Sequence, residues 1–319
     1  MWRGHLVQDA GMQSSQRLAR GVGSALAAAL AFGITAPLLA RTTAGLGVLV
    51  SGCLLYLGAA AGALLLAMGR GRRPSAALLQ RRAITRLLLV ALLGGAVAPV
   101  LLIWGLQRIN PATGALLLVL EAPFTVVLAR LLLREQMGPR VAVAAALMIA
   151  GSVLIASPVG AGGQALGAAL VVAATLAWAG DNLLSRGLAD HDPLGVVALK
   201  GMLGAIASGL AAVAFDQTLP SWPRVAALLG IGAFGYGASL QFYLRAQSLI
   251  GAGRTASVFA AGPFFGAVAA LVLGAPWPGW SLPAAAALMI AGVALHLSES
   301  RRFPLSDSAP QTPGGAPGG

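Results

Sequence analysis

A single carboxylate, Glu121, stands in the middle of the apolar run LLLVLEAPFTVVLA. It lies about nine residues into its predicted helix, roughly 13 Å from one surface of a membrane core about 30 Å thick. Acidic residues at such depth commonly face a protein interior or a wet cavity and act on ions or substrates. Glu121 is therefore our first candidate for proton coupling or for binding a cationic group. A protonated carboxyl that clamps two helices together is the structural alternative.

Pro123 adds a polar feature beside this carboxyl. Because proline has no N–H, the carbonyl of Val119 loses its usual helical partner and the helix is expected to kink. Pro263 stands at the matching position of a similar segment later in the chain, where we expect a second kink.

Asp181, Asn182 and Lys200 form a second candidate group. Asp181 lies about five residues before the end of one predicted helix, and Lys200 about seven residues into the next, which places both roughly 7–10 Å below one surface. A short link makes the two helices antiparallel neighbours, so we expect an Asp181–Lys200 ion pair, since charges persist in membranes by pairing. The pair either fixes helix register or takes part in gating or ligand contact.

Two more polar residues complete the candidate set. Gln241 lies within an apolar helix, and Arg254 begins another helix beside Thr255 and Ser257, where it could meet an anionic substrate. The residues expected in substrate or proton coupling are Glu121, Asp181, Asn182, Lys200, Gln241 and Arg254. We predict no catalytic residue, because no paired His or Cys accompanies these acids and Glu121 and Asp181 are expected at different depths.

Composition places these residues in a membrane protein. The chain is 58% hydrophobic and 9% charged, whereas soluble domains carry about 25% charged residues. A net charge of +12 would suggest nucleic acid in a soluble protein, but here the arginines lie between apolar runs, so no nucleic-acid partner is expected. The sole cysteine is Cys53, and the sequence has no CxxC, His cluster or acidic metal-ligand spacing, so we expect no metal and no cofactor.

The apolar runs predict ten membrane-spanning helices. They lie near residues 22–40, 46–68, 84–107, 112–133, 139–157, 165–186, 193–215, 223–245, 253–274 and 281–298. With the N-terminus in the cytosol, only Arg41, Arg108 and Arg224 of the 21 Lys and Arg residues fall outside, as the positive-inside rule favours. We therefore expect a multi-pass protein of a bacterial inner membrane with both termini cytoplasmic.

The chain also repeats itself. The octapeptide AAALMIAG occurs at 144–151 and at 285–292, and EAPFTVVLARLLL aligns with AGPFFGAVAALVL so that Pro123 matches Pro263. Five helices per half invert the second copy in the membrane. The predicted fold is thus an all-α membrane protein of two inverted five-helix repeats. The expected organisation is a cytoplasmic tail (1–20), repeat one (21–157), repeat two (163–299) and a disordered cytoplasmic tail (300–319).

These segments resemble a known family. The run LLLVLEAPFTVVLARLLLREQMGPRVAVAAALMIAGSVLI is similar to the drug/metabolite transporters of the EamA type, and so are LAWAGDNLLSR and VALKGMLG in the second half. The resemblance covers about residues 21–298. It implies ten helices, alternating access and small substrates such as amino acids or drugs, often exported. The sequence departs from a symmetric pattern at the acid Glu135 in the turn of the first repeat, which has Ala275 or Pro276 opposite it.

We therefore expect a secondary transporter that exports a small metabolite or drug by alternating access, with Glu121 as the coupling or binding acid. Its partners would be the solute and membrane lipid, with a homodimer as an open alternative. A structural or regulatory membrane protein and a membrane-embedded enzyme are the competing readings, of which the enzyme is disfavoured. A liposome assay with candidate solutes would separate the three.

Overall fold

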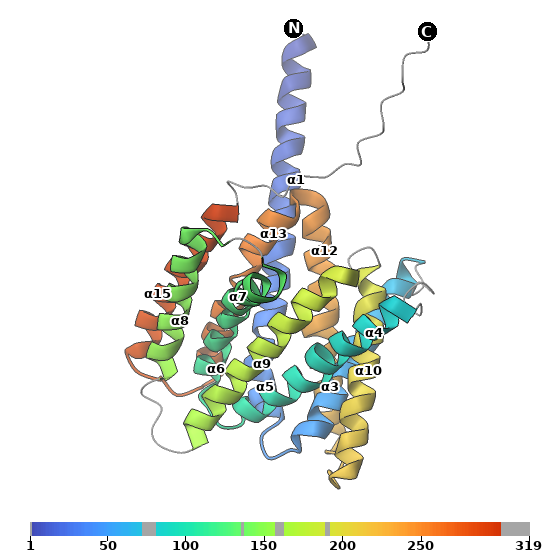
Figure 1. Cartoon of the computed structure of the whole chain (residues 1–319). Helices are drawn as coiled ribbons and strands as arrows, with labels where there is room; N and C mark the ends of the chain where they lie inside the picture. The colour runs from blue at the N-terminus through green and yellow to red at the C-terminus, as the bar shows by residue number, and fades with distance from the viewer. Residues whose placement is uncertain (1, 72–80, 135–136, 157–162, 189–191, 301–319) are drawn as a thin grey trace, which may run out of the picture.

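The computed structural model describes residues 2–71, 81–134, 137–156, 163–188 and 192–300. Within these ranges it contains ten helical segments long and apolar enough to cross a membrane (Figure 1). They are Gln16–Thr42, Val48–Gly69, Ile84–Leu106, Pro111–Leu133, Pro139–Ala156, Gln164–Ser185, Pro193–Ala214, Trp222–Ile250, Arg254–Val272 and Ser281–Ser298. Each segment lies where the sequence predicts a span. A helix is the form expected there, because backbone polar groups inside lipid must form their hydrogen bonds within the segment.

Several spans are built from more than one element. The first half comprises α1 (Trp2–Gly33), α2 (Thr35–Thr42), α3 (Val48–Gly69), α4 (Arg81–Val90), η2 (Ala91–Val97), α5 (Ala98–Leu106), α6 (Pro111–Leu117), η3 (Leu118–Leu120), α7 (Glu121–Leu133) and α8 (Pro139–Ala156). The second half comprises α9 (Gly163–Ser185), η4 (Arg186–Leu188), α10 (Pro193–Ala214), α11 (Trp222–Gly232), η5 (Ala233–Ala238), α12 (Ser239–Ile250), α13 (Ala252–Phe259), α14 (Gly262–Val272) and α15 (Ser281–Ser300).

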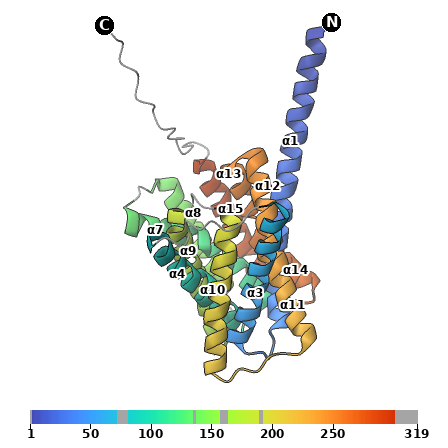
Figure 2. The same cartoon turned by 90° about the vertical axis from the view of Figure 1, so that its right-hand side faces the viewer.

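The segment predicted as an N-terminal tail is helical. Helix α1 begins at Trp2 and extends well beyond the bundle before it enters the first span (Figures 1 and 2). The first span consists of two helices, because α1 gives way to α2 at Ile34. Glu135 and the predicted disordered residues 301–319 lie outside the described residues.

The two AAALMIAG copies pack against each other. Helices α8 and α15 lie side by side (Figure 1), and a Cβ on Gly151 would meet Ala285 O at 2.9 Å. Reciprocally, a Cβ on Gly292 would meet Ala144 O at 2.8 Å. Residue pairs that match under the repeat therefore make matching contacts, as expected for antiparallel helices related by a two-fold axis in the membrane plane. The duplicated glycines are needed here because the two backbones approach too closely for a side chain.

This contact gives a stability prediction. We expect Gly292→Ala to lower the unfolding free energy by about 1–3 kcal/mol, because the new methyl collides with backbone and cannot be relieved by a rotamer change. The matched control is Gly230→Ala, where nothing lies within 4 Å of the added Cβ and stability should hold or rise slightly. Thermal unfolding of the purified protein in detergent measures both. Equal midpoints for the two variants would contradict the close contact.

Two spans contain matching π-helical segments. η2 interrupts the third span and η5 interrupts the eighth, its counterpart in the second half. η2 packs on α9 and α10, the first two spans of the second half, while η5 packs on α1 and α3, the first two spans of the first half. π-helical turns are rare and occur often at functional sites. Both lie at the interface between the halves, where inverted-repeat proteins place their substrate sites.

Candidate functional site

Glu121 begins a new helix in the middle of its span. The chain changes from α6 to the 3₁₀ turn η3 and then to α7, of which Glu121 is the first residue. Pro123 therefore sits in the first turn of α7, where its missing N–H costs little. The break that the sequence predicts as a proline kink is thus a 3₁₀ turn that precedes the proline.

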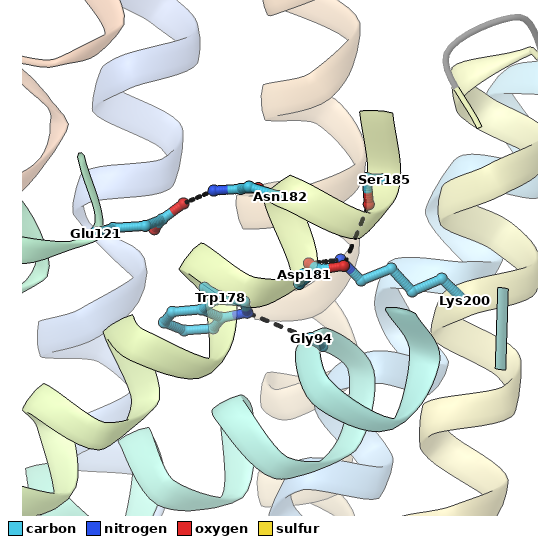
Figure 3. A network of polar contacts seen from close by, with 7 residues as sticks. All are labelled: Gly94, Glu121, Trp178, Asp181, Asn182, Ser185 and Lys200. Carbon is cyan, nitrogen blue, oxygen red and sulfur yellow. Dashed lines mark hydrogen bonds and ion pairs between the residues drawn. The ribbon is translucent and has the colours of Figure 1, made fainter. Parts of the chain in front are cut away.

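The Glu121 carboxylate contacts the other half of the molecule. Asn182 Nδ2, on α9, donates a hydrogen bond of 2.6 Å to Glu121 Oε1 (Figure 3). Glu121 is partly buried, whereas Asn182 is exposed. The bond therefore joins the two repeats at the edge of the core, with the Asn182 side chain exposed.

Asp181 and Lys200 form the ion pair that the sequence predicts. Lys200 Nζ contacts Asp181 Oδ2, and Ser185 Oγ donates to Asp181 Oδ1 at 3.3 Å. The Asp181 side chain is 3% exposed and that of Lys200 is 17% exposed, so the carboxylate is enclosed and depends on its partners. Figure 3 shows the neighbouring side chains of Asp181 and Asn182 leaving α9 toward Lys200 and Glu121 respectively.

The π-helix η2 closes over this ion pair. A Cβ on Gly94 would collide with the Asp181 carboxylate, and one on Gly95 would lie 2.9 Å from the Lys200 carbonyl oxygen. Trp178 Nε1 donates to Gly94 O at 3.2 Å, which ties η2 to α9 (Figure 3). Gly94 is therefore required by the ion pair beneath it, and Gly95 by the close approach of the α10 backbone.

Glu121 and Asp181 lie closer together than the expectation of different depths implies. Asn182, adjacent to Asp181, reaches Glu121, which brings the Glu121 carboxylate to the same turn of α9 that carries Asp181. Helix α9 crosses the bundle obliquely (Figure 1), so counting residues from its end misjudges the depth of its side chains. The four residues form one polar network at the interface of the halves.

A cavity of about 260 Å³ lies beside the network. Five aromatic rings line it, and we call it the aromatic cavity: Phe32 (α1), Tyr56 (α3), Tyr236 (η5), Tyr243 (α12) and Phe259 (α13). Lys200 of the network also lines the aromatic cavity. Network and cavity are thus adjacent parts of one site.

The remaining two candidates lie apart from this site. Neither Gln241 nor Arg254 lines the aromatic cavity. Gln241 Oε1 is buried and has no hydrogen-bond partner within the part of the chain that the structure describes. Arg254 is exposed near the start of α13, where its neighbour Thr255 donates to Gly251 O at 2.8 Å.

Sequence reasoning missed the aromatic lining. The five rings come from five elements, and none has a local pattern that separates it from lipid-facing or packing aromatics. Only the two π-helices had a visible signal, in the glycine-rich strings LLGGA and FGYGA.

Comparison with known proteins identifies the family. The model of the EamA-like transporter family matches residues 19–157 and 165–298, which are most of both halves. The chain belongs to the EamA-like transporter family. It is therefore a multi-pass membrane transporter, and its described residues contain ten spans in two repeats.

Other comparisons bear on the fold of this EamA-like transporter. Fifteen chains of solved structures match it. One, described as "Crystal structure of protein", has a TM-score of 0.64 and 20% sequence identity, with 88% of this chain and 98% of the solved chain covered. At that identity the likeness shows a shared fold. A search of curated proteins found no match.

Proposed function

We propose that this EamA-like transporter exports a small organic solute in exchange for protons, with Glu121 as the group that carries the proton. The observation that supports this most is the Glu121–Asn182 hydrogen bond, which joins an intramembrane carboxyl of the first half to an exposed amide of the second half. A carboxyl at that place can bind a proton in one access state and release it in the other as the halves move.

The position of the aromatic cavity supports export. Tyr243, Phe259 and Lys200 lie in the parts of their helices nearer to the side from which α1 enters the bundle. The distribution of arginines favours the cytosol for that side. We propose that the cavity loads from the cytosol, as an exporter requires, and that inward proton movement supplies the free energy for export.

Proteoliposomes test the proposal. The purified full chain is reconstituted with a pH-sensitive dye inside, and pools of amino acids, nucleosides, organic acids and organic cations are offered under an imposed pH gradient. We expect one pool to accumulate against its gradient and to collapse the pH difference faster than in protein-free liposomes. Accumulation without proton movement contradicts the coupling. No uptake from any pool contradicts transport of these solutes.

Orientation is tested by cysteine labelling. In a Cys53→Ala background, Ser221→Cys lies between α10 and α11, and Arg70→Cys follows α3 on the opposite side. Both positions are exposed. We expect an impermeant maleimide to label Ser221→Cys in intact cells and Arg70→Cys only after the cells are opened. The reverse pattern would place both termini outside the cytosol.

A further inference from the structure

The rings of the aromatic cavity form an unbroken series of contacts. Ring centroids lie 5.4 Å apart for Tyr56 and Tyr236, 6.0 Å for Tyr236 and Phe32, 5.5 Å for Phe32 and Phe259, and 5.1 Å for Phe259 and Tyr243. Two rings belong to the first half and three to the second, so a ligand in the cavity contacts both halves. Such a lining favours a ligand with an apolar surface.

The charges around the cavity do not balance. Lys200 is the only charged side chain among the described residues that line it, and its ammonium is neutralised by Asp181. Glu121 has a neutral partner, Asn182. When Glu121 is ionised, the three groups together carry one excess negative charge next to the rings.

We propose that the aromatic cavity binds an organic monocation that carries apolar substituents around its charge. The negative faces of aromatic rings attract cations, and several rings around one site recognise alkylated ammonium groups. Glu121 supplies the counter-charge that the ion pair cannot. This substrate class rests on the proposed transport function and adds to it the chemistry that selects the solute.

Three molecules of nearly equal shape test the charge preference: choline, 3,3-dimethylbutan-1-ol and 3,3-dimethylbutanoate, which are a cation, a neutral carbon isostere and an anion. Binding to the purified full chain is measured by calorimetry. The pH is one at which the Glu121→Gln variant and the wild type differ in their affinity for choline. We expect choline to bind about tenfold more tightly than the alcohol, and the anion to bind most weakly. Equal affinities for choline and the alcohol, or tighter binding of the anion than of choline, would overturn the proposal.

Ring variants assign the effect to the cavity. Tyr236→Leu should weaken choline binding about threefold or more while leaving the alcohol nearly unchanged, whereas Tyr236→Phe should keep most of the preference. Phe215→Leu is the matched control, because Phe215 is 74% exposed and does not line the cavity. If Tyr236→Leu fails to fold, Tyr243→Leu replaces it at the edge of the ring series. An unchanged preference in both folded ring variants would contradict the assignment.

A parallel transport measurement distinguishes failure of the monocation proposal from failure of the transport proposal. Labelled choline is followed in proteoliposomes in parallel with the binding measurement. Transport of a solute of another charge class, with no preference for choline, refutes the monocation and leaves the transporter in place. Selective choline binding without movement across the bilayer supports the site and contradicts the proposed transport cycle.

Discussion

Replacing Glu121 with glutamine abolishes solute accumulation driven by a pH gradient, with a loss of more than about tenfold, because the amide cannot bind and release a proton. Glutamine has the shape of glutamate, and its carbonyl oxygen can still accept the hydrogen bond from Asn182. The fold should therefore survive the change. Exchange between compartments of equal pH should persist for a solute that does not rely on the Glu121 charge, because exchange needs movement of the halves without net proton transfer. Exchange of an organic monocation should weaken, because the variant also removes the counter-charge.

The control for this experiment is Asp216→Asn. Asp216 is an exposed carboxylate with a φ of 51°, a left-handed conformation that asparagine tolerates well. We expect wild-type accumulation in this variant. Full gradient-driven accumulation by Glu121→Gln would exclude Glu121 as the proton carrier. Loss of both accumulation and exchange, with a lowered unfolding temperature, would favour the structural clamp.

Replacing Asp181 with asparagine should destabilise the protein by about 3–5 kcal/mol, since it leaves the Lys200 ammonium without its ionic partner in a tightly packed site. The π-helix allows no easy rearrangement, because Gly94 lies against the Asp181 carboxylate. A second change, Lys200→Met, should recover most of that stability by removing the unpaired charge. The double variant should also transport within about threefold of wild type if the pair serves to fix helix register.

Thermal unfolding in detergent and transport in liposomes give the two measurements. Arg41→Met is the control, because Arg41 is exposed at the C-terminal end of the first span. Its loss should change neither the unfolding temperature nor the transport rate. A double variant that is stable but does not transport would assign the pair to gating or ligand contact. A stable Asp181→Asn single variant would show that Lys200 finds another partner.

The sequence alone determined the spans, the repeat and the acid. Membrane insertion depends on apolar content over about 20 consecutive residues, which is a local property that any stretch such as LLLVLEAPFTVVLA displays directly. The inverted orientation followed from an odd number of spans per half, and the octapeptide AAALMIAG marked the helices α8 and α15 that pack together. The Asp181–Lys200 pair could also be predicted from the sequence, because a short link forces the two helices to be neighbours.

Only the tertiary structure decided how the site is assembled. Glu121 and Asn182 are 61 residues apart, and the oblique path of α9 brings them together at a depth that helical rise does not predict. The aromatic cavity needs rings from five elements, each of which could equally face lipid or core when considered by itself. Contacts of this kind depend on helix tilt and on local changes from α to 3₁₀ or π geometry. Apolar composition determines which segments cross the membrane, but it determines neither the tilt nor these local changes.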